Sequence, residues 1–335
     1  MPRYDFVSDN TAPATPEAMQ AIVEANTGCT AGYGADDVTA RAADYVRGFL
    51  DADAEVRFVG SGTAANAIAL ATLCRPFEAV LAHEHAHVAI DETGAPGFFG
   101  HGLRVAPLPG ASGLIDEAAL NSALNFADSP HVQSPAVLSL TNATEYGAVY
   151  SNAALEALAG PAKAKGLGVH LDGARLANAA AAGFDVKAIK DIGVDILIIG
   201  GAKSGMPPSE AIVIFNRAIT PRFDARLKQS GQLPSKGRFY AAPFIGMLRD
   251  GAQLRHAAHA NAMARRLAEQ LAFPRVHPVQ SNGVFIALDE PRRLKLIEAG
   301  WQSSRFLDGS VRFMCSWATT PEAVDELAEA LRSLA

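Results

Sequence analysis

A single lysine stands directly after a short, strongly apolar segment. Residues 196–199 are Ile-Leu-Ile-Ile, and Lys203 follows them within the sequence Gly-Gly-Ala-Lys-Ser-Gly. An uninterrupted run of this kind predicts an interior strand of a parallel sheet that is covered on both faces, and such sheets bind their ligands at the carboxyl ends of the strands. A desolvated lysine amine at that place can form a Schiff base with an aldehyde. The alternative is a solvated loop lysine, which this stretch by itself leaves open.

A carboxylate follows a second predicted strand, 31 residues before Lys203. Residues 168–171 are Gly-Val-His-Leu, and Asp172 begins the sequence Asp-Gly-Ala-Arg directly after them. This separation is about one β-α-β unit, so Asp172 and Lys203 are expected at the same edge of the sheet. A carboxylate there can pair with the protonated nitrogen of a pyridine ring, the pairing by which pyridoxal phosphate (PLP) becomes an electron sink. The two residues predict PLP bound to Lys203, with a plain helix cap as the alternative role of Asp172.

A glycine-rich turn joins a third predicted strand, residues 56–59, to an alanine-rich helix. The turn is Gly-Ser-Gly-Thr and supplies Ser61, Gly62 and Thr63. Free backbone N–H groups and the positive end of a helix dipole bind phosphate at such a turn without a basic side chain. The turn lacks the third glycine of a dinucleotide fingerprint and the lysine of a P-loop, which disfavours NAD and ATP. A tight turn with a hydroxyl helix cap is the alternative.

Three alternating histidines follow a fourth predicted strand and allow two kinds of chemistry. The ring of His87 can stack on a flat cofactor, and Asp91, one helical turn later, can orient that ring so that His87 acts as a base. The other possibility is a metal site built on His83, His85 and His87. Their spacing differs from the i, i+4 pair of zinc proteases, so no metal is predicted.

The composition is typical of a globular enzyme. The chain has 335 residues, 49% hydrophobic and 19% charged, with a net charge of −6 and no long basic run. Neither a nucleic acid nor an anionic membrane is therefore expected as a partner. No stretch approaches the roughly 18 apolar residues of a membrane span, and the start carries acidic and polar residues in place of a secretory signal, which predicts a cytoplasmic protein.

The order of the predicted elements indicates two domains. Strands and helices alternate as far as residue 238, which predicts an N-terminal segment and a large PLP-binding domain over residues 1–238. A long helix from about residue 239 to 271 then links to a small α+β domain, so that residues 239–335 form the second part. Arg312 lies in a predicted strand of this part among apolar neighbours, where a guanidinium is unfavourable unless an anion meets it.

These segments together resemble one family. Ser-Asp-Asn near the start, SGTAAN, the His87 region, HLDGAR and GGAKSG occur in the order found in PLP-dependent enzymes of the aspartate-aminotransferase-like superfold (fold type I). Within that superfold they resemble the low-specificity L-threonine aldolase and β-eliminating lyase family. The resemblance covers essentially the whole chain. It implies an α/β fold in which a large domain with a seven-stranded, mostly parallel sheet precedes a small C-terminal α+β domain.

The resemblance also implies roles in cofactor binding, carried over by position. Lys203 would hold the cofactor, Asp172 would contact the pyridine nitrogen and His87 would stack on the ring. The other cofactor-binding residues implied in this way are Ser61, Gly62 and Thr63 at the phosphate, together with Arg175 and Lys236.

Substrate binding follows from the resemblance in the same way. Ser8, Arg175 and Arg312 match the positions that bind the substrate carboxylate. In the family a neighbouring subunit contributes to each site, which implies a homo-oligomer, either a dimer or a homotetramer. The residues expected to act from the neighbour are Tyr33, as a substrate-binding residue, and the group Lys228, Lys236 and Arg238.

The implied activity is cleavage of the Cα–Cβ bond of L-β-hydroxy-α-amino acids to glycine and an aldehyde. The implied substrates are L-threonine, L-allo-threonine and, in the subgroup that the chain resembles, aromatic compounds such as L-phenylserine. Two motifs depart from the family: Glu145 stands where many members carry a histidine, and Lys203 lies in GGAKSG in place of SLSKG. The base is therefore left open between His87 with Asp91, Glu145 and a water. A PLP-dependent β-eliminating lyase or racemase, and a non-catalytic ligand-binding protein, are the alternative functions.

Overall fold

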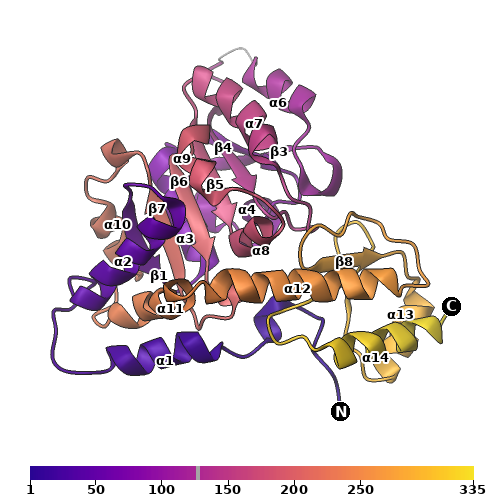
Figure 1. Cartoon of the computed structure of the whole chain (residues 1–335). Coiled ribbons are helices and arrows are strands. Elements are labelled where there is room, and N and C mark those ends of the chain that lie inside the picture. The colour runs from indigo at the N-terminus through magenta and orange to yellow at the C-terminus, as the bar shows by residue number, and fades with distance from the viewer. Residues whose placement is uncertain (126–128) are drawn as a thin grey trace.

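A seven-stranded sheet forms the centre of the larger part of the chain (Figure 1). The computed structural model describes residues 1–125 and 129–335. Neighbouring strands are parallel except at β7, which is antiparallel to both β1 and β6, so the predicted α/β fold with a mostly parallel sheet is confirmed. In their order across the sheet, the strands are β1 (Glu55–Val59), β7 (Glu210–Ile214), β6 (Ile196–Gly200), β5 (Gly168–Gly173), β4 (Ser134–Thr141), β2 (Glu78–His83) and β3 (Arg104–Leu108).

Helices cover both faces of this sheet, as its apolar strands require. The helices of this part are α1 (Pro16–Ala25), α2 (Asp37–Leu50), α3 (Gly62–Leu73), α4 (His87–Ile90), α5 (Ala95–Phe99), α6 (Glu117–Leu124), α7 (Asn152–Ala164), α8 (Leu176–Ala181), α9 (Ile189–Ile192), α10 (Phe223–Gln229) and α11 (Arg238–Arg249). α3 packs on one face, and α2 and α7 pack on the other. Over the described residues, no helix has the length and apolar character needed to cross a bilayer.

The strand that precedes the candidate lysine is buried on both faces, as its sequence predicts. Successive side chains of a strand point to opposite sides of the sheet. In β6, Ile196 and Ile198 belong to a hydrophobic cluster with residues of α3, whereas Leu197 and Ile199 belong to another cluster with residues of α2 and α7. Fully burying each such side chain stabilises the fold by about 1.5–3 kcal/mol. The loop that follows β6 is therefore held in a fixed place at the edge of the sheet.

The second part of the chain is built on a three-stranded antiparallel sheet. Its elements are α12 (Ala252–Glu269), β8 (Gly283–Ile286), α13 (Glu290–Glu298), β9 (Ser304–Arg305), β10 (Val311–Met314) and α14 (Pro321–Arg332). Their apolar side chains form one core, which also includes Phe6 from the start of the chain. The ring of Phe6 lies 5.7 Å from that of Trp301, measured between centroids. The first residues of the chain are thus part of the second core.

The predicted linking helix over residues 239–271 is interrupted. α11 ends at Arg249 and α12 begins at Ala252, because Gly251 adopts a left-handed conformation with a φ of 67°. The prediction of one continuous helix is therefore wrong. α11 packs into the core of the large sheet, and α12 extends from that core to the second one (Figure 1). The two cores meet along α12, and a domain boundary at residue 239 stays a prediction.

Candidate active site

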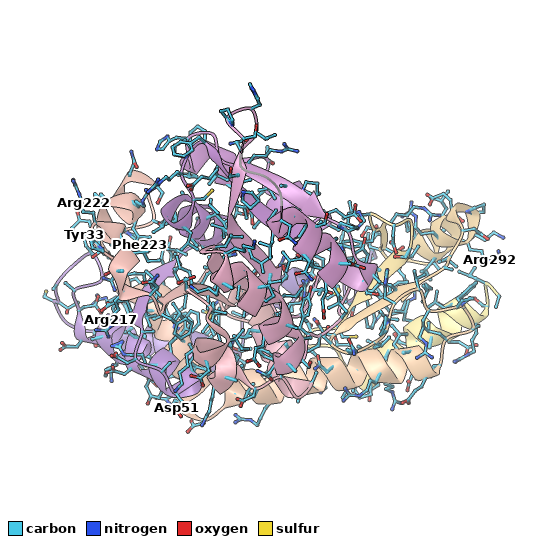
Figure 2. The ribbon with its side chains drawn as sticks, turned by 90° about the horizontal axis from the view of Figure 1, so that it is seen from above. Tyr33, Asp51, Arg217, Arg222, Phe223 and Arg292 are labelled. Atoms are coloured by element: carbon cyan, nitrogen blue, oxygen red, sulfur yellow. The ribbon has the colours of Figure 1, made fainter. Side chains whose placement is uncertain are left out.

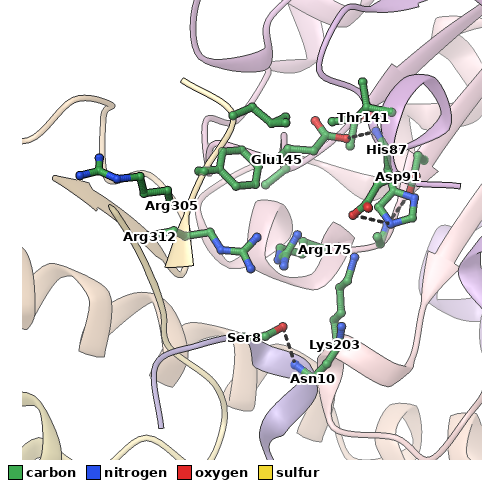
Figure 3. A pocket seen from close by; sticks show the side chains of 16 residues that line it. Ser8, Asn10, His87, Asp91, Thr141, Glu145, Arg175, Lys203, Arg305 and Arg312 are labelled. Carbon is green, nitrogen blue, oxygen red and sulfur yellow. Dashed lines mark hydrogen bonds and ion pairs between the residues drawn. The ribbon is translucent and has the colours of Figure 1, made fainter. Parts of the chain in front are cut away.

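Two adjoining cavities, of about 380 and 270 Å³, lie at the carboxyl edge of the large sheet. Both are lined by Lys203 from the turn after β6, Asp172 from the end of β5 and His87 from the start of α4. The structure therefore brings together the three residues that the sequence predicts around one cofactor. Figure 3 shows the larger cavity, into which the side chains of Lys203 and His87 both extend.

The environment of Lys203 favours its nucleophilic form. Burial, and next the nearby guanidinium of Arg175, lower the pKa of the lysine amine, so that more of it is unprotonated at neutral pH. Glu210, at the start of β7, lines the smaller cavity and accepts a hydrogen bond of 2.8 Å from the backbone N–H of Gly201. Burial raises the pKa of Glu210 to about 7. Glu210 is not among the residues predicted from the sequence, where it is only a carboxylate at the start of a strand.

Asp172 is buried and is held from two sides. Its Oδ1 accepts a hydrogen bond of 2.8 Å from the backbone N–H of Ala174, and its Oδ2 accepts one of 2.8 Å from Nδ2 of Asn66. These donors orient the carboxylate at the wall of both cavities. A buried acceptor of this kind suits a cationic ring nitrogen, because a buried carboxylate needs a partner of opposite charge.

His87 lies among three carboxyl groups. Its backbone N–H donates to Glu145 Oε1 at 2.9 Å, and its ring Nδ1 lies 2.9 Å from Glu92 Oε1. The hydrogen bond to Glu92 raises the pKa of the imidazole. Asp91, the predicted partner, is 3.7 Å from Nε2 and its side chain is 78% exposed. The nearer, buried partner is Glu92, which the i, i+4 spacing does not indicate because α4 ends after one turn.

Glu145 has the character of a proton donor or acceptor. Burial raises the pKa of its carboxyl group. Its Oε2 is buried and has no hydrogen-bond partner among the described residues, and the side chain lines the larger cavity. A carboxyl group with a raised pKa that faces a cavity can exchange a proton with a substrate.

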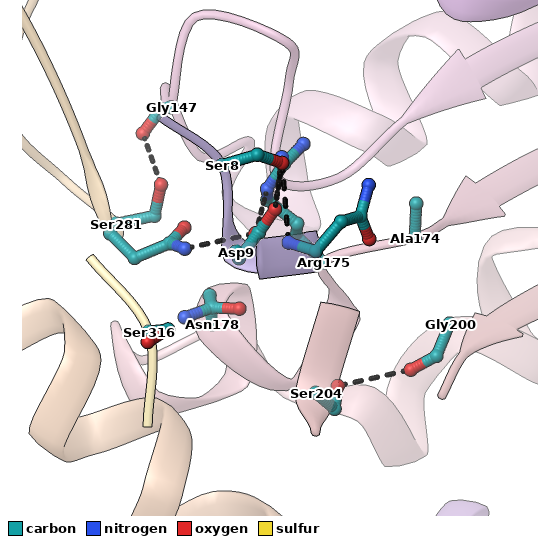
Figure 4. A network of polar contacts seen from close by, with 12 residues as sticks. Ser8, Asp9, Gly147, Ala174, Arg175, Asn178, Gly200, Ser204, Ser281 and Ser316 are labelled. Carbon is teal, nitrogen blue, oxygen red and sulfur yellow. Dashed lines mark hydrogen bonds and ion pairs between the residues drawn. The ribbon is translucent and has the colours of Figure 1, made fainter. Parts of the chain in front are cut away.

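The two candidate arginines for the substrate carboxylate differ in how they are held. Arg175 is engaged by Asp9, whose carboxylate accepts from Nε at 2.7 Å and from Nη2 at 2.9 Å (Figure 4). Burial opposes the ionisation of Asp9, but the Arg175 guanidinium outweighs it and the pKa of Asp9 is lowered. Arg312, on β10, makes one long hydrogen bond to the carbonyl of Val7 at 3.3 Å, and its buried Nε has no partner in the described parts of the chain. The unpartnered Nε of Arg312 fits a carboxylate. Ser8, whose hydroxyl donates to Asp9 Oδ1 at 3.4 Å, lines the same cavity.

The glycine-rich turn shares the smaller cavity with Lys203. Ser61 caps α3, because its Oγ accepts a hydrogen bond of 3.2 Å from the N–H of Ala64. Ser61, Gly62 and Thr63 line the smaller cavity together with Lys203. The first N–H groups of a helix have no intrahelical acceptor and attract anions. An amine, a carboxylate, an aromatic ring and an anion-binding helix end in adjoining cavities are a donor set that fits PLP.

His83 and His85, the other two of the three alternating histidines, have separate partners. His83 Nε2 lies 3.0 Å from the carbonyl oxygen of Gly110, and His85 Nδ1 lies 2.7 Å from the hydroxyl of Tyr146. Within residues 1–125 and 129–335, no group of three or more His, Cys, Asp or Glu side chains is arranged to hold a metal ion.

Tyr33 and Lys236 lie away from this site in a single chain. Tyr33 lines a different cavity beside β1, and the amine of Lys228 lies 4.5 Å from the centroid of its ring. Figure 2 shows Tyr33 next to Arg222, at the end of the molecule opposite Arg292. Neither Tyr33 nor Lys236 is among the described residues that line the cavities around Lys203.

Known proteins resemble this chain over nearly its whole length. A model of the family described as Beta-eliminating lyase matches residues 5–291. The chain is 45% identical to a low specificity L-threonine aldolase of Pseudomonas aeruginosa, with 98% of this chain and 96% of that protein covered. It is 28% identical to one of Saccharomyces cerevisiae over 86% of this chain and 75% of that protein. A structure of Leishmania major threonine aldolase matches with a TM-score of 0.92 and 31% identity, covering 99% of this chain and 100% of that one.

Proposed function

The chain belongs to the β-eliminating lyase family, and we propose that it acts there as a PLP-dependent aldehyde-lyase of the threonine aldolase type. Its reaction is the cleavage of the Cα–Cβ bond of L-β-hydroxy-α-amino acids to glycine and an aldehyde. The substrates are L-threonine and L-allo-threonine, and we extend them to L-phenylserine. The observation that carries this proposal is the convergence of Lys203, Asp172 and His87 on one pair of cavities.

The cofactor would be held by residues from several elements of the large sheet. When bound, PLP supplies an electron sink for the electron pair that remains on Cα after the Cα–Cβ bond breaks. Lys203 would bind its aldehyde carbon, Asp172 its ring nitrogen and His87 the face of its ring. The phosphate would be bound by the cap of α3, with Ser61, Gly62 and Thr63.

The substrate carboxylate would be bound between the two parts of the chain. Arg312 approaches from β10 with unused donors, and Arg175 approaches from the end of β5 with its orientation fixed by Asp9. Ser8 adds a hydroxyl group on the same wall. A carboxylate held at two guanidinium groups has a defined orientation, so the bond to be broken is presented in one geometry.

Bond cleavage requires a base for the β-hydroxyl proton. We assign this role to His87, because the hydrogen bond that its ring donates to Glu92 raises the pKa of the ring and makes it a stronger base near neutral pH. Glu145, with one free oxygen at the wall of the larger cavity, is the alternative. Asp91, exposed and 3.7 Å from Nε2, would contact the same nitrogen from the solvent side.

A second subunit would complete the site. Within one chain, none of four residues, Tyr33, Lys228, Lys236 and Arg238, is among the described residues that line the cavities around Lys203. We propose that they act in a neighbouring copy of a homotetramer, with Lys236 at the cofactor and Tyr33 at the substrate. The enzyme would work in the cytoplasm. Light scattering coupled to size exclusion would distinguish a tetramer from a dimer, and a monomer with full activity would contradict the shared site.

Product analysis tests the proposed reaction. The purified protein is incubated with PLP and either L-threonine or L-phenylserine, and glycine, aldehyde, ammonia and keto acid are quantified. Equal amounts of glycine and acetaldehyde or benzaldehyde are expected. Ammonia with a keto acid would indicate β-elimination instead, and a change of optical rotation without cleavage would indicate racemisation.

A further inference from the structure

A chain of hydrogen bonds runs behind the cavity from Asp172 to His87. Asn66, on α3, donates from the same Nδ2 to Asp172 Oδ2 at 2.8 Å and to Glu92 Oε1 at 2.9 Å. Glu92 Oε1 in turn lies 2.9 Å from Nδ1 of His87. Asn66 and Glu92 are both buried. Asp172 and His87 are therefore joined through Asn66, which lines the smaller cavity, and Glu92, which is hydrogen-bonded to the imidazole.

The orientation of the Asn66 amide is fixed by its neighbours. An amide nitrogen carries two hydrogens and only donates, whereas an amide oxygen only accepts. If the amide were reversed, its oxygen would lie within 2.9 Å of two carboxylate oxygens, which accept as well. The nitrogen therefore faces Asp172 and Glu92, and each of its hydrogens has one acceptor.

This orientation determines which of the two ring nitrogens of His87 carries the proton. Burial raises the pKa of the Glu92 carboxyl group, whereas its hydrogen bonds with His87 and Asn66 favour the ionised form. In that form Oε1 accepts from Asn66 and has no proton to donate, so its second contact must also be a donor. The second contact is Nδ1 of His87 at 2.9 Å. We propose that Glu92 is a positioning residue that holds the proton of the neutral His87 ring on Nδ1 and leaves Nε2 as the basic atom on the side of the cavity. The catalytic meaning of this assignment rests on the proposed function, in which His87 takes a substrate proton.

Glu92 is better placed for this role than Asp91. The side chain of Glu92 is fully buried, whereas that of Asp91 is 78% exposed, and the contacts to the ring are 2.9 Å and 3.7 Å respectively. Solvent screens an exposed carboxylate, and a hydrogen bond is stronger where water is excluded. Asp91 instead faces Nε2, where it would favour the opposite tautomer. The two carboxylates thus compete for the ring, and the buried one prevails.

The tautomer can be observed directly in the intact protein. Full-length protein with ¹⁵N-labelled histidine, with and without PLP, is examined by solid-state NMR at a pH well above the pKa of the ring. The His87 signals are assigned by comparison with His87→Asn. A protonated Nδ1 and an unprotonated Nε2 are expected in the wild-type protein. A proton on Nε2 would overturn the proposal.

Two substitutions of Glu92 separate positioning from simple packing. Glu92→Gln retains an oxygen that accepts from both Asn66 and His87, so the proton is expected to stay on Nδ1. Glu92→Leu removes the acceptor, and the proton is expected to move to Nε2 beside Asp91, with kcat for L-threonine lowered about 10- to 100-fold and KM within about threefold. Similar kcat losses in both variants, with the tautomer unchanged in both, would indicate packing alone and contradict the proposal.

Asp91→Asn is the matched control at the competing carboxylate. Its tautomer is expected to be that of the wild type, and a shift in this variant but not in Glu92→Leu would assign the role to Asp91 and overturn the proposal. If Glu92→Leu fails to fold, the wild-type, Glu92→Gln and Asp91→Asn spectra still decide the question. The spectra are independent of substrate turnover, so a failed tautomer assignment is distinguishable from a failed aldolase assignment, which depends only on the products.

Discussion

The two walls of the active-site cavity are built differently. The wall from the large sheet, which we call the rigid wall, holds its functional groups tightly. Asp172 accepts hydrogen bonds of 2.8 Å from Asn66 and Ala174, the His87 ring lies 2.9 Å from buried Glu92, and Lys203 follows a strand that is buried on both faces. On the wall from the small sheet, which we call the looser wall, the side chains have fewer contacts that fix them. Arg312 has a buried Nε without a partner in the described residues, and Leu307 is 52% exposed.

This difference matches the different tasks of the groups that break the bond and the groups that bind the substrate. Bond-breaking groups need a fixed geometry before the substrate arrives, and neighbours that are already paired provide it. A group that recognises the substrate must instead keep hydrogen-bonding capacity free until the substrate supplies the missing partner. The rigid wall is therefore expected to determine kcat, and the looser wall to determine KM and specificity.

The largest effect is expected at Lys203, where the comparison is tested on the rigid wall. Lys203→Ala should lower kcat by at least about 10⁴-fold, because no other amine of the described residues lines the cavities to replace it. Visible absorbance of the bound cofactor should shift as well, since the covalent link is lost. Lys187→Ala, at an exposed lysine, is the control and should behave as the wild type. Cleavage at a comparable rate by Lys203→Ala would remove the basis of the proposed function.

The next effect contrasts the two arginines. Arg312→Leu should lower kcat/KM about 100- to 1,000-fold, by loss of a charge-assisted contact to the substrate, while the free energy of unfolding stays near that of the wild type. Arg175→Leu should also destabilise the fold by about 3–5 kcal/mol, because Asp9 would be left buried and unpaired. Chemical denaturation of both variants measures this difference. Equal losses of stability would show that the two walls do not differ in the stated way.

A smaller effect concerns stability and pH. Burial raises the pKa of Glu210 from 4.5 to about 7, so the folded chain keeps a proton that the unfolded chain releases. The stability from this group is therefore fully present below pH 4.5 and is lost as the pH rises towards 7, by roughly 3 kcal/mol in total. Glu210→Gln should remove this part of the pH dependence, as measured by denaturant unfolding of the cofactor-free protein at several pH values. Parallel curves for the two proteins would contradict the assignment.

The smallest effect is expected at Leu307 on the looser wall. Leu307→Ala should lower kcat/KM for L-phenylserine by less than about tenfold and leave the value for L-threonine nearly unchanged, because one exposed apolar contact contributes little. The ratio of the two specificity constants is the measurement. An equal loss for both substrates would place Leu307 in the reaction geometry instead of in the recognition of the β-substituent.

The sequence predicts the functional residues of the rigid wall better than the buried carboxylates that hold them in place. Lys203 and Asp172 follow apolar strands, and the rule that parallel strands present ligands at their carboxyl ends is enough to bring both to one edge. Glu92 and Asp9 carry no such local signal. Glu92 meets His87 only because α4 is one turn long, and Asp9 meets Arg175 across 166 residues of sequence. Contacts of that kind depend on how elements far apart in the sequence pack together. The periodicity of apolar residues carries no information on that packing.

The interrupted helix illustrates the same limit within the fold. The pattern of apolar residues continues through residues 239–271, but Gly251 has a left-handed backbone that divides α11 from α12. Glycine occurs both within helices and at their ends, so the sequence does not show whether the helix continues through Gly251. The interruption follows from the packing of α11 and α12 against two separate cores. Tyr33 shows a further limit, because the action in another subunit that we propose for it depends on contacts between chains, which the sequence of one chain does not contain.

Asp9 also constrains the order in which a newly made chain can mature. Its carboxylate accepts hydrogen bonds from Arg175 and from Asn282, the latter 273 positions later in the chain. Contacts of such large sequence separation form slowly, because the entropy of closing the loop is lost before the contact is gained. The cavity also takes Arg312 from β10, so its lining is complete only after the two parts of the chain have folded against each other.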